Sequence, residues 1–356
     1  MSDLHALNRE FERYDQVLKG HTYRLAEGEG DAFDEDYEIA TLDLGRYLHG
    51  DSTERARFAK EFAAALGEIG FAVLTGHGVD TALYDDAHDG VLELFTSTSL
   101  PDKMRFRAGR HGSVSQGYFP IEETSEIHPD LVEGWVWCRR AFDIPQDRGT
   151  AFRPEDFWPL AEYEPRFRPL VLAHEQLIKP IAQAMFEGLG VDPHVYDRKL
   201  TRTNFGLRFN YYPPMSSVQD QSGAGRLFGH EDVDLFTILP ATRVEGLQVW
   251  NHLSRAWVRM NAPPGSLIIN TGDYMQRITN DLLPSTTHRV GKPRDGSHRA
   301  EARVSFPIAV YVWEDELLEV LPGLGAPRYE PVKAIAFHTR STSKFYGDDY
   351  AVEGFD

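Results

Sequence analysis

The spacing of apolar residues changes along the chain, and this change separates a helical first half from a strand-rich second half. Between Asp51 and Gly70, apolar residues recur every three or four positions, which predicts a helix with Asp51 as its N-terminal cap. Residues 81–95 and 169–189 follow the same period and predict two further helices. The short apolar run 71–75, just after Gly70, predicts a buried strand.

From about residue 203 onward, apolar and polar residues alternate in short runs that Gly, Pro and Asn separate. Such runs are 247–250, 257–260, 266–270 and 304–313, with Pro307 expected at an edge or a bulge. This texture is typical of a β-sandwich or barrel. We therefore expect a mainly β chain with helical decoration (α+β), built on a double-stranded β-helix, or jelly roll, that helices buttress.

The expected organisation is one compact unit with four segments. A polar stretch near residue 30 predicts a flexible lead-in over residues 1–36. We expect a helical and strand region over 37–200, the jelly-roll core over 201–315, and a strand and helix tail over 316–356.

The charge and the cysteine content of the chain exclude several classes of binding partner and of structural site. The chain has 356 residues and a net charge of −18, which argues against nucleic acid or an anionic membrane as partner, because both require a basic surface. The single cysteine, Cys138, excludes an internal disulfide and a thiolate zinc cluster, and it suits a reducing cytoplasm. No apolar stretch approaches the roughly 18 residues of a membrane span. We expect a soluble cytoplasmic protein that acts on a small molecule, in an oligomeric state that stays open.

One imidazole and one carboxylate separated by a single residue can bind the same metal ion. His230 and Asp232 lie in the run 228–239, and if this run is a strand or the approach to one, both side chains leave the same face. Alone, a His-x-Asp pair is more often an ordinary histidine beside an acid. The pair therefore indicates a metal site only if a third ligand can be found elsewhere in the chain.

His288, which follows a Pro-Ser turn signal, is the best candidate for that third ligand, and His252 is its most serious rival. Two histidines and one carboxylate on one side of a metal form the facial triad of non-haem iron(II) oxygenases. This triad leaves coordination positions open for a cosubstrate and dioxygen.

Two further runs place polar side chains on one face of a strand, which suggests a carboxylate site in the first run and a lined pocket in the second. Arg303 and Ser305 share one face of an alternating strand, where a guanidinium and a hydroxyl can grip a carboxylate together. Arg208, Asn210 and Tyr212 share a face of an earlier strand by the same alternation. Taken singly, a surface ion pair for Arg303 and a core position for Tyr212 are the commoner interpretations.

Together these segments resemble the isopenicillin N synthase-like family of iron(II) and 2-oxoglutarate-dependent dioxygenases. The likeness covers most of the chain and includes, in order, residues 39–44, 65–79, 210–213, 230–232, 245–249, 270–273, 288–290 and 303–305. Two segments depart from the family pattern: residues 291–298 form a long polar insert, and residues 281–285 lack the usual Gly-x-Tyr.

The resemblance implies Fe(II) as the metal, with 2-oxoglutarate and dioxygen as cosubstrates. It implies that the iron ligands are His230, Asp232 and His288. It also implies that Arg303, Ser305 and Tyr212 hold the distal carboxylate of 2-oxoglutarate, with Asn210 near its keto-acid end. The expected reaction couples oxidative decarboxylation of 2-oxoglutarate to oxidation, in first place hydroxylation, of a small organic substrate.

Family members contribute strands near the substrate where this chain has Tyr118, Trp135, Trp137 and Arg139, although buried aromatic residues are more often plain core. Two alternatives remain open. In an isopenicillin N synthase-type oxidase, the same iron works without 2-oxoglutarate, and Arg303 and Ser305 grip the carboxylate of the substrate. The other alternative is a non-catalytic jelly-roll binding protein. The identity of the substrate, and the choice between hydroxylation, desaturation, ring closure and fragmentation, stay open.

Overall fold

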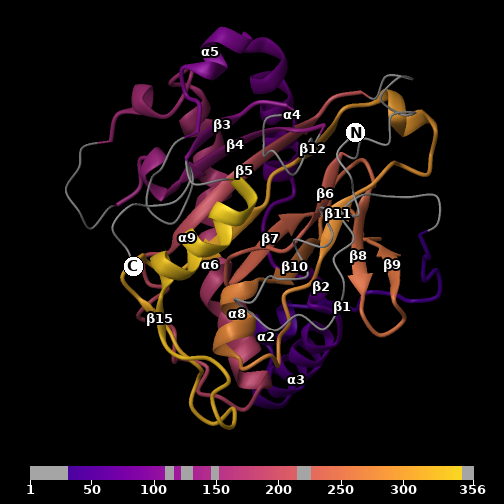
Figure 1. Cartoon of the computed structure of the whole chain (residues 1–356), viewed down its shortest axis with the longest axis vertical. Helices are drawn as coiled ribbons and strands as arrows, with labels where there is room; N and C mark the ends of the chain where they lie inside the picture. The colour runs from indigo at the N-terminus through magenta and orange to yellow at the C-terminus, as the bar shows by residue number, and fades with distance from the viewer. Residues whose placement is uncertain (1–30, 109–115, 122–130, 146–151, 215–225, 347–356) are drawn as a thin grey trace.

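The chain folds into two facing β-sheets with helices on the outer side of the larger one (Figure 1). The computed structural model describes residues 31–108, 116–121, 131–145, 152–214 and 226–346. Within these residues, the large sheet has the strand order β1-β2-β10-β7-β13-β5-β4-β3, and β12 pairs with β5. The small sheet has the order β6-β11-β8-β9, and a separate pair consists of β14 and β15.

The strands of the large sheet are β1 Thr41–Asp43, β2 Phe71–Thr75, β3 Gly117–Phe119, β4 Glu133–Cys138, β5 Asn204–Tyr212, β7 Phe236–Pro240, β10 Leu267–Thr271, β12 Arg303–Ser305 and β13 Ile308–Tyr311. Those of the small sheet are β6 Leu227–His230, β8 Leu247–Asn251, β9 Ala256–Arg259 and β11 His288–Val290. The pair consists of β14 Leu317–Leu318 and β15 Val332–Lys333. Apart from the parallel β1–β2 pair, neighbouring strands run antiparallel, as in a jelly roll.

The helices are α2 Gly45–His49, α3 Ser52–Ile69, α4 Ala82–Ser97, α5 Leu100–Met104, α6 Tyr163–Gly188, α8 Asp273–Ile278 and α9 Ala334–Tyr346, with short 3-10 turns at Arg139–Ala141, Pro154–Asp156 and Ser297–Ala300. The side chain of Asp51 accepts hydrogen bonds from the first turn of α3, and Gly70, at φ 73°, ends that helix, as the sequence predicts. No helix within the described residues is both long and apolar enough to cross a membrane.

Each face of the large sheet belongs to a different hydrophobic cluster. On the outer face, residues such as Trp137 and Phe209 pack with α3, α4 and α6 in one continuous core. On the inner face, Val73 and Ile268 pack against Val249 of the small sheet. The predicted jelly-roll core with buttressing helices is therefore confirmed.

Three predicted elements differ from the structure. Helix α6 begins at Tyr163 rather than near Pro169, because buried residues continue at helical spacing through the prolines. The run 304–313 divides at Pro307 into β12 and β13, since proline supplies no N–H to the ladder. The run 228–239 is likewise two strands, β6 and β7, with a connection between them.

Residues at the two ends of the chain complete the picture. The predicted lead-in falls mostly outside the described residues, but Asp31 pairs with Arg289 at 2.8 Å and Phe33 forms a bridge with Trp257. Residues 31–36 thus lie along β9 and are not a free lead-in. At the other end, α9 extends the chain beyond β15, and the final residues of the expected tail helix lie outside the described part.

Candidate metal centre

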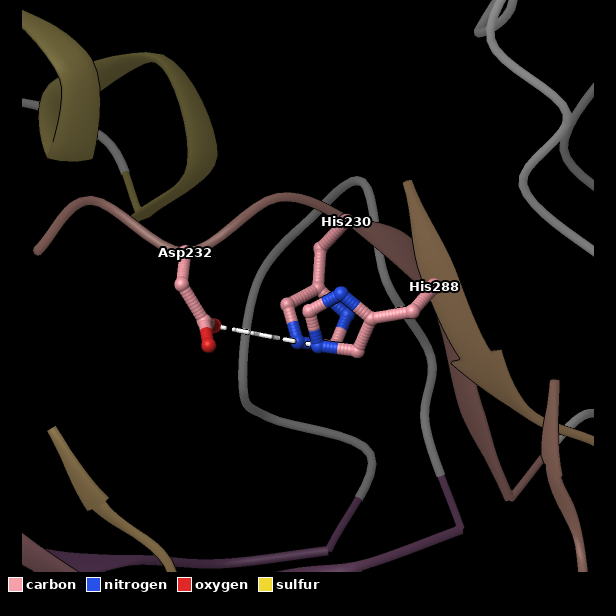
Figure 2. A group of neighbouring side chains, drawn as sticks. All are labelled: His230, Asp232 and His288. Atoms are coloured by element: carbon pink, nitrogen blue, oxygen red, sulfur yellow. Dashed lines mark ion pairs between the residues drawn. The ribbon is translucent and has the colours of Figure 1, made fainter. Parts of the chain in front are cut away.

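His230, Asp232 and His288 converge between the two sheets (Figure 2). His230 is the last residue of β6 and lies directly across from His288, the first residue of β11. The Nε2 atoms of His230 and His288 lie 3.7 and 3.8 Å from Oδ1 of Asp232. Asp232 follows β6 in the connection to β7, so a chain turn brings it to the histidines, and not strand alternation as the sequence pattern predicts.

Backbone carbonyls fix the protonation of both imidazoles. Nδ1 of His230 lies 2.9 Å from the carbonyl oxygen of Phe228, and Nδ1 of His288 lies 3.1 Å from that of Thr286. A carbonyl only accepts hydrogen bonds, so each Nδ1 carries a proton, and in the neutral imidazole each Nε2 keeps its lone pair. Both lone pairs therefore belong to the atoms nearest to Asp232.

The carboxylate of Asp232 is held from its far side. Its Oδ2 accepts hydrogen bonds of 2.8 Å from the hydroxyl of Thr237 and from the side-chain amide of Asn270. Burial acts to raise the pKa of Asp232, but the neighbouring His288 and His230 and these two hydrogen bonds outweigh it and hold the pKa below its ordinary value. The group is therefore ionised at neutral pH, with Oδ1 directed to the histidines.

A second carboxyl group, that of Asp234, lies behind Thr237. The Thr237 hydroxyl oxygen is 2.7 Å from Oδ2 of Asp234. Burial, together with the charge of Asp232, raises the pKa of Asp234 well above its ordinary value, which favours its protonated form. Because a hydroxyl has one proton, Thr237 donates to one of the two carboxyl groups at a time.

These donors suit iron(II). Two neutral imidazole nitrogens and one ionised carboxylate oxygen, all within 4.8 Å of one another, provide the two-histidine, one-carboxylate set that leaves other coordination positions open. Glu231, between the two ligands, is directed elsewhere: it accepts a 2.8 Å hydrogen bond from the hydroxyl of Thr287. His252, the rival to His288, is not part of this cluster.

The four residues that the family resemblance assigns to 2-oxoglutarate lie together on the inner face of β5 and β12. Arg303 pairs with Tyr212, and Ser305 pairs with Asn210. The side-chain amide of Asn210 donates to the Ser305 hydroxyl at 3.3 Å. The guanidinium of Arg303, 1% exposed, lies 4.9 Å from the ring of Tyr212, and burial lowers its pKa.

Strand register links these residues to the metal cluster. Residues paired directly across strands share a face of the sheet. Pairing runs from Asn270 to Thr237, then to Ala309 and Gly206 on β5, so the residues at even positions of β5 share the face of Thr237. Asn210, Tyr212, Ser305 and Arg303 therefore occupy the face that holds Asp232.

The four predicted substrate residues lie on the opposite face or away from it, which corrects their predicted position. Tyr118, Trp135 and Trp137 are directed into the helix-covered core, where Trp137 stacks on Trp158 at 4.4 Å. Arg139 follows β4 and forms an ion pair with Glu175 of α6. The side chains of β3 and β4 that share the face of Asn210 are therefore the neighbours of these residues.

Their neighbours occupy the metal-side face instead. Pairing places Val136 and Gly134 of β4 opposite Arg208 and Asn210, and Phe119 of β3 opposite Gly134. The Arg208 side chain donates to Asn210 at 2.8 Å and lies 5.8 Å from the Phe119 ring. These residues could have been predicted from the strand register, because residues paired across the sheet with Asn210 share its face.

Comparison with known proteins agrees with this geometry. The family model for the 2OG-Fe(II) oxygenase superfamily matches residues 203–308, and the model for the non-haem dioxygenase in morphine synthesis N-terminal region matches residues 39–161. Gibberellin 20 oxidase 1-D of Triticum aestivum is 30% identical over 258 residues, which are 72% of this chain and 68% of that protein. Isopenicillin N synthase of Streptomyces clavuligerus is 27% identical over 281 residues, 71% of this chain and 79% of that protein. A Neurospora crassa protein solved in complex with alpha-KG and thymine superposes with a TM-score of 0.75 at 20% identity, over 90% of this chain and all of that one.

Proposed function

The chain belongs to the 2OG-Fe(II) oxygenase superfamily, and we propose that His230, Asp232 and His288 hold its iron. It is an iron(II) and 2-oxoglutarate-dependent oxygenase that acts on a small molecule with dioxygen. The observation that supports the ligand assignment is the convergence of two imidazole lone pairs and one ionised carboxylate from segments more than fifty residues apart.

We further propose that Arg303, Ser305 and Tyr212 bind the distal carboxylate of 2-oxoglutarate and that Asn210 lies near its keto-acid end. Their shared face with Thr237 supports this assignment. Bound iron supplies the redox chemistry in which decarboxylation of 2-oxoglutarate to succinate is coupled to oxidation of a C–H bond. The chain supplies orientation: Thr237 and Asn270 fix the carboxylate, and the backbone fixes the imidazoles.

Hydroxylation is the proposed outcome, because direct oxygen insertion requires no further group from the protein. The net charge of −18 favours a small organic substrate over nucleic acid, and the single cysteine favours a cytoplasmic location. We infer that residues 201–315 form the jelly-roll core for iron and 2-oxoglutarate, that 37–200 form the N-terminal helical and strand region, and that 316–356 form a strand and helix tail.

The test is an anaerobic titration of the iron(II) protein with 2-oxoglutarate. We expect one iron per chain and a weak visible charge-transfer band that saturates at one equivalent of 2-oxoglutarate. His288→Ala should lose both signals, whereas His88→Ala, at a partly exposed histidine on α4, should keep them. Iron that binds equally well to the His288→Ala chain would contradict the ligand assignment.

An isopenicillin N synthase-type oxidase is the second candidate, because the Streptomyces clavuligerus enzyme is among the relatives. In that case Arg303 and Ser305 bind a carboxylate of the substrate itself. Oxygen consumption that yields succinate in a one-to-one ratio supports the first function. Oxygen consumption without succinate supports the second.

A further inference from the structure

Arg226, one residue before β6, is a buried cation whose guanidinium is largely without acceptors. It is 1% exposed, and its Nη2 donates to the backbone carbonyl of Glu301 at 3.3 Å. Its Nε and Nη1 are buried and find no acceptor among the described residues. Charged donors that are buried without acceptors destabilise the folded chain, because the lost hydration of the charge is not replaced.

A second buried guanidinium, that of Arg303, adds to this destabilisation. Nε of Arg303 donates to the carbonyl of Val244 at 3.2 Å, whereas its buried Nη1 has no acceptor in the part of the chain that the structure describes. Burial and then the positive charge of Arg303 lower the pKa of Arg226 to about 10, so both groups remain charged at neutral pH. Tyr212, beside Arg303, offers a ring and a hydroxyl rather than a carboxylate.

Arg226 donates to the carbonyl of Glu301, two residues before Arg303, and its neighbour Leu227 packs with Tyr212, so these two buried cations with unused donors lie in one region that suits an anion. We propose that Arg226 and Arg303 together bind the distal carboxylate of 2-oxoglutarate, so that the clamp has two guanidinium groups. This inference rests on the proposed function of Arg303, Ser305 and Tyr212, and it adds Arg226 to that set. A carboxylate has two oxygens and about four acceptor positions, enough to receive Nε and Nη1 of Arg226 as well as Nη1 of Arg303.

The experiment compares two ligands that differ at one end. 2-Oxoglutarate and 2-oxopentanoate share the keto-acid end, but 2-oxopentanoate has a methyl group where the distal carboxylate lies. Calorimetry on anaerobic iron(II) protein gives both dissociation constants. For Arg226→Met we expect binding of 2-oxoglutarate to weaken by about 10- to 100-fold, as for loss of charge-assisted hydrogen bonds, and binding of 2-oxopentanoate by less than about 3-fold.

A second variant keeps the test decisive should the methionine chain fail to fold. Arg226→Lys retains the charge but loses the planar guanidinium with its paired N–H donors. The affinity for 2-oxoglutarate should therefore fall by about 3- to 10-fold, and the affinity for 2-oxopentanoate should not change. Arg166→Met, at an arginine that pairs with Asp86 and Glu93, controls for the change in net charge and should alter neither constant.

Thermal unfolding supplies a readout independent of ligand affinity. Without ligand, Arg226→Met should unfold at or above the wild-type temperature, because the variant no longer buries an unpaired charge. A lower unfolding temperature, together with an equal loss of affinity for both ligands, would overturn the proposal. Arg226 would then only stabilise the fold. Unchanged affinity for 2-oxoglutarate in Arg226→Lys and Arg226→Met would overturn it as well.

The failure of this inference differs from failure of the proposed function. If Arg303→Met weakens the binding of 2-oxoglutarate and the Arg226 variants do not, only the inference about Arg226 is wrong. If the wild-type chain binds 2-oxopentanoate as tightly as 2-oxoglutarate, the cosubstrate site itself is wrong.

Discussion

The two oxygens of the Asp232 carboxylate have different tasks. Oδ2 is committed to Thr237 and Asn270, and Oδ1 is directed to the two histidines. Groups behind a metal ligand set its orientation and basicity, and their loss commonly costs 10- to 100-fold in metal affinity. The hydroxyl of Thr237 has the further role of separating Asp232 from the buried Asp234.

At this scale we predict the effect of Thr237→Val, which has nearly the same shape but no hydroxyl. Iron(II) affinity should fall by about 10- to 100-fold, because Asp232 loses one donor and faces Asp234 without a mediator. An anaerobic competition titration with a coloured chelator measures this constant. Thr96→Val, which removes a hydroxyl bound to its own helix on α4, is the control and should bind iron as the wild type does.

The two faces of strand β4 have different surroundings. Trp137 faces the helices and stacks between Trp135 and Trp158, whereas Val136 faces the metal side and packs with Phe119. A shift of one position along a strand exchanges the faces of all its side chains. Core packing and the face shared with the proposed metal site therefore alternate residue by residue along this strand.

This alternation leads to a paired prediction. Trp137→Ala should lower the free energy of unfolding by about 3–5 kcal/mol, because it leaves a cavity in the core. Val136→Ala should change that free energy far less and should alter the ratio of kcat/KM between a larger and a smaller substrate by about 10-fold or more. Denaturant unfolding and succinate release measure the two effects. A change of substrate ratio in a still-folded Trp137→Ala chain, with none in Val136→Ala, would contradict the assignment of faces.

The sequence predicts those features that depend on local patterns. Asp51 and Gly70 mark the ends of α3 because capping and a left-handed terminus depend on few neighbours. The alternation in β5 likewise predicts that Asn210 and Tyr212 share a face. Features that depend on tertiary contacts are different: the turn that brings Asp232 to His288 and the phase of β4 follow from packing between distant segments.

At the scale of the whole molecule, one hydrophobic core joins the helices to the large sheet, and it encloses a histidine. His174 of α6 is fully buried and lies 3.3 Å from the hydroxyl of Tyr84 on α4. Burial, with a smaller contribution from the charge of His77, lowers the pKa of His174 to about 3. The imidazole is thus neutral in the folded chain, and protonation favours unfolding.

We predict that acid destabilises the whole chain through His174. Its pKa is lower in the folded than in the unfolded state, so its contribution is complete above about pH 6.5 and is lost as the pH falls toward 3. At pH 5 the loss should be about 2 kcal/mol. Urea unfolding measures the free energy of unfolding at pH 7 and at pH 5. The decrease between these two pH values should be smaller by about this amount in His174→Asn than in the wild type. Equal pH dependence of the two proteins would contradict the role of His174.

The separation of the ligands along the chain has a consequence for synthesis. His288 leaves the ribosome more than fifty residues after Asp232, and Arg303 follows later still. A nascent chain that ends before His288 carries one imidazole and one carboxylate of the set, too few to retain the metal firmly. With the proposed ligand set, we expect firm iron binding only after β11 has paired with β6, so that the iron content of a preparation should rise with the fraction of molecules that have completed the barrel.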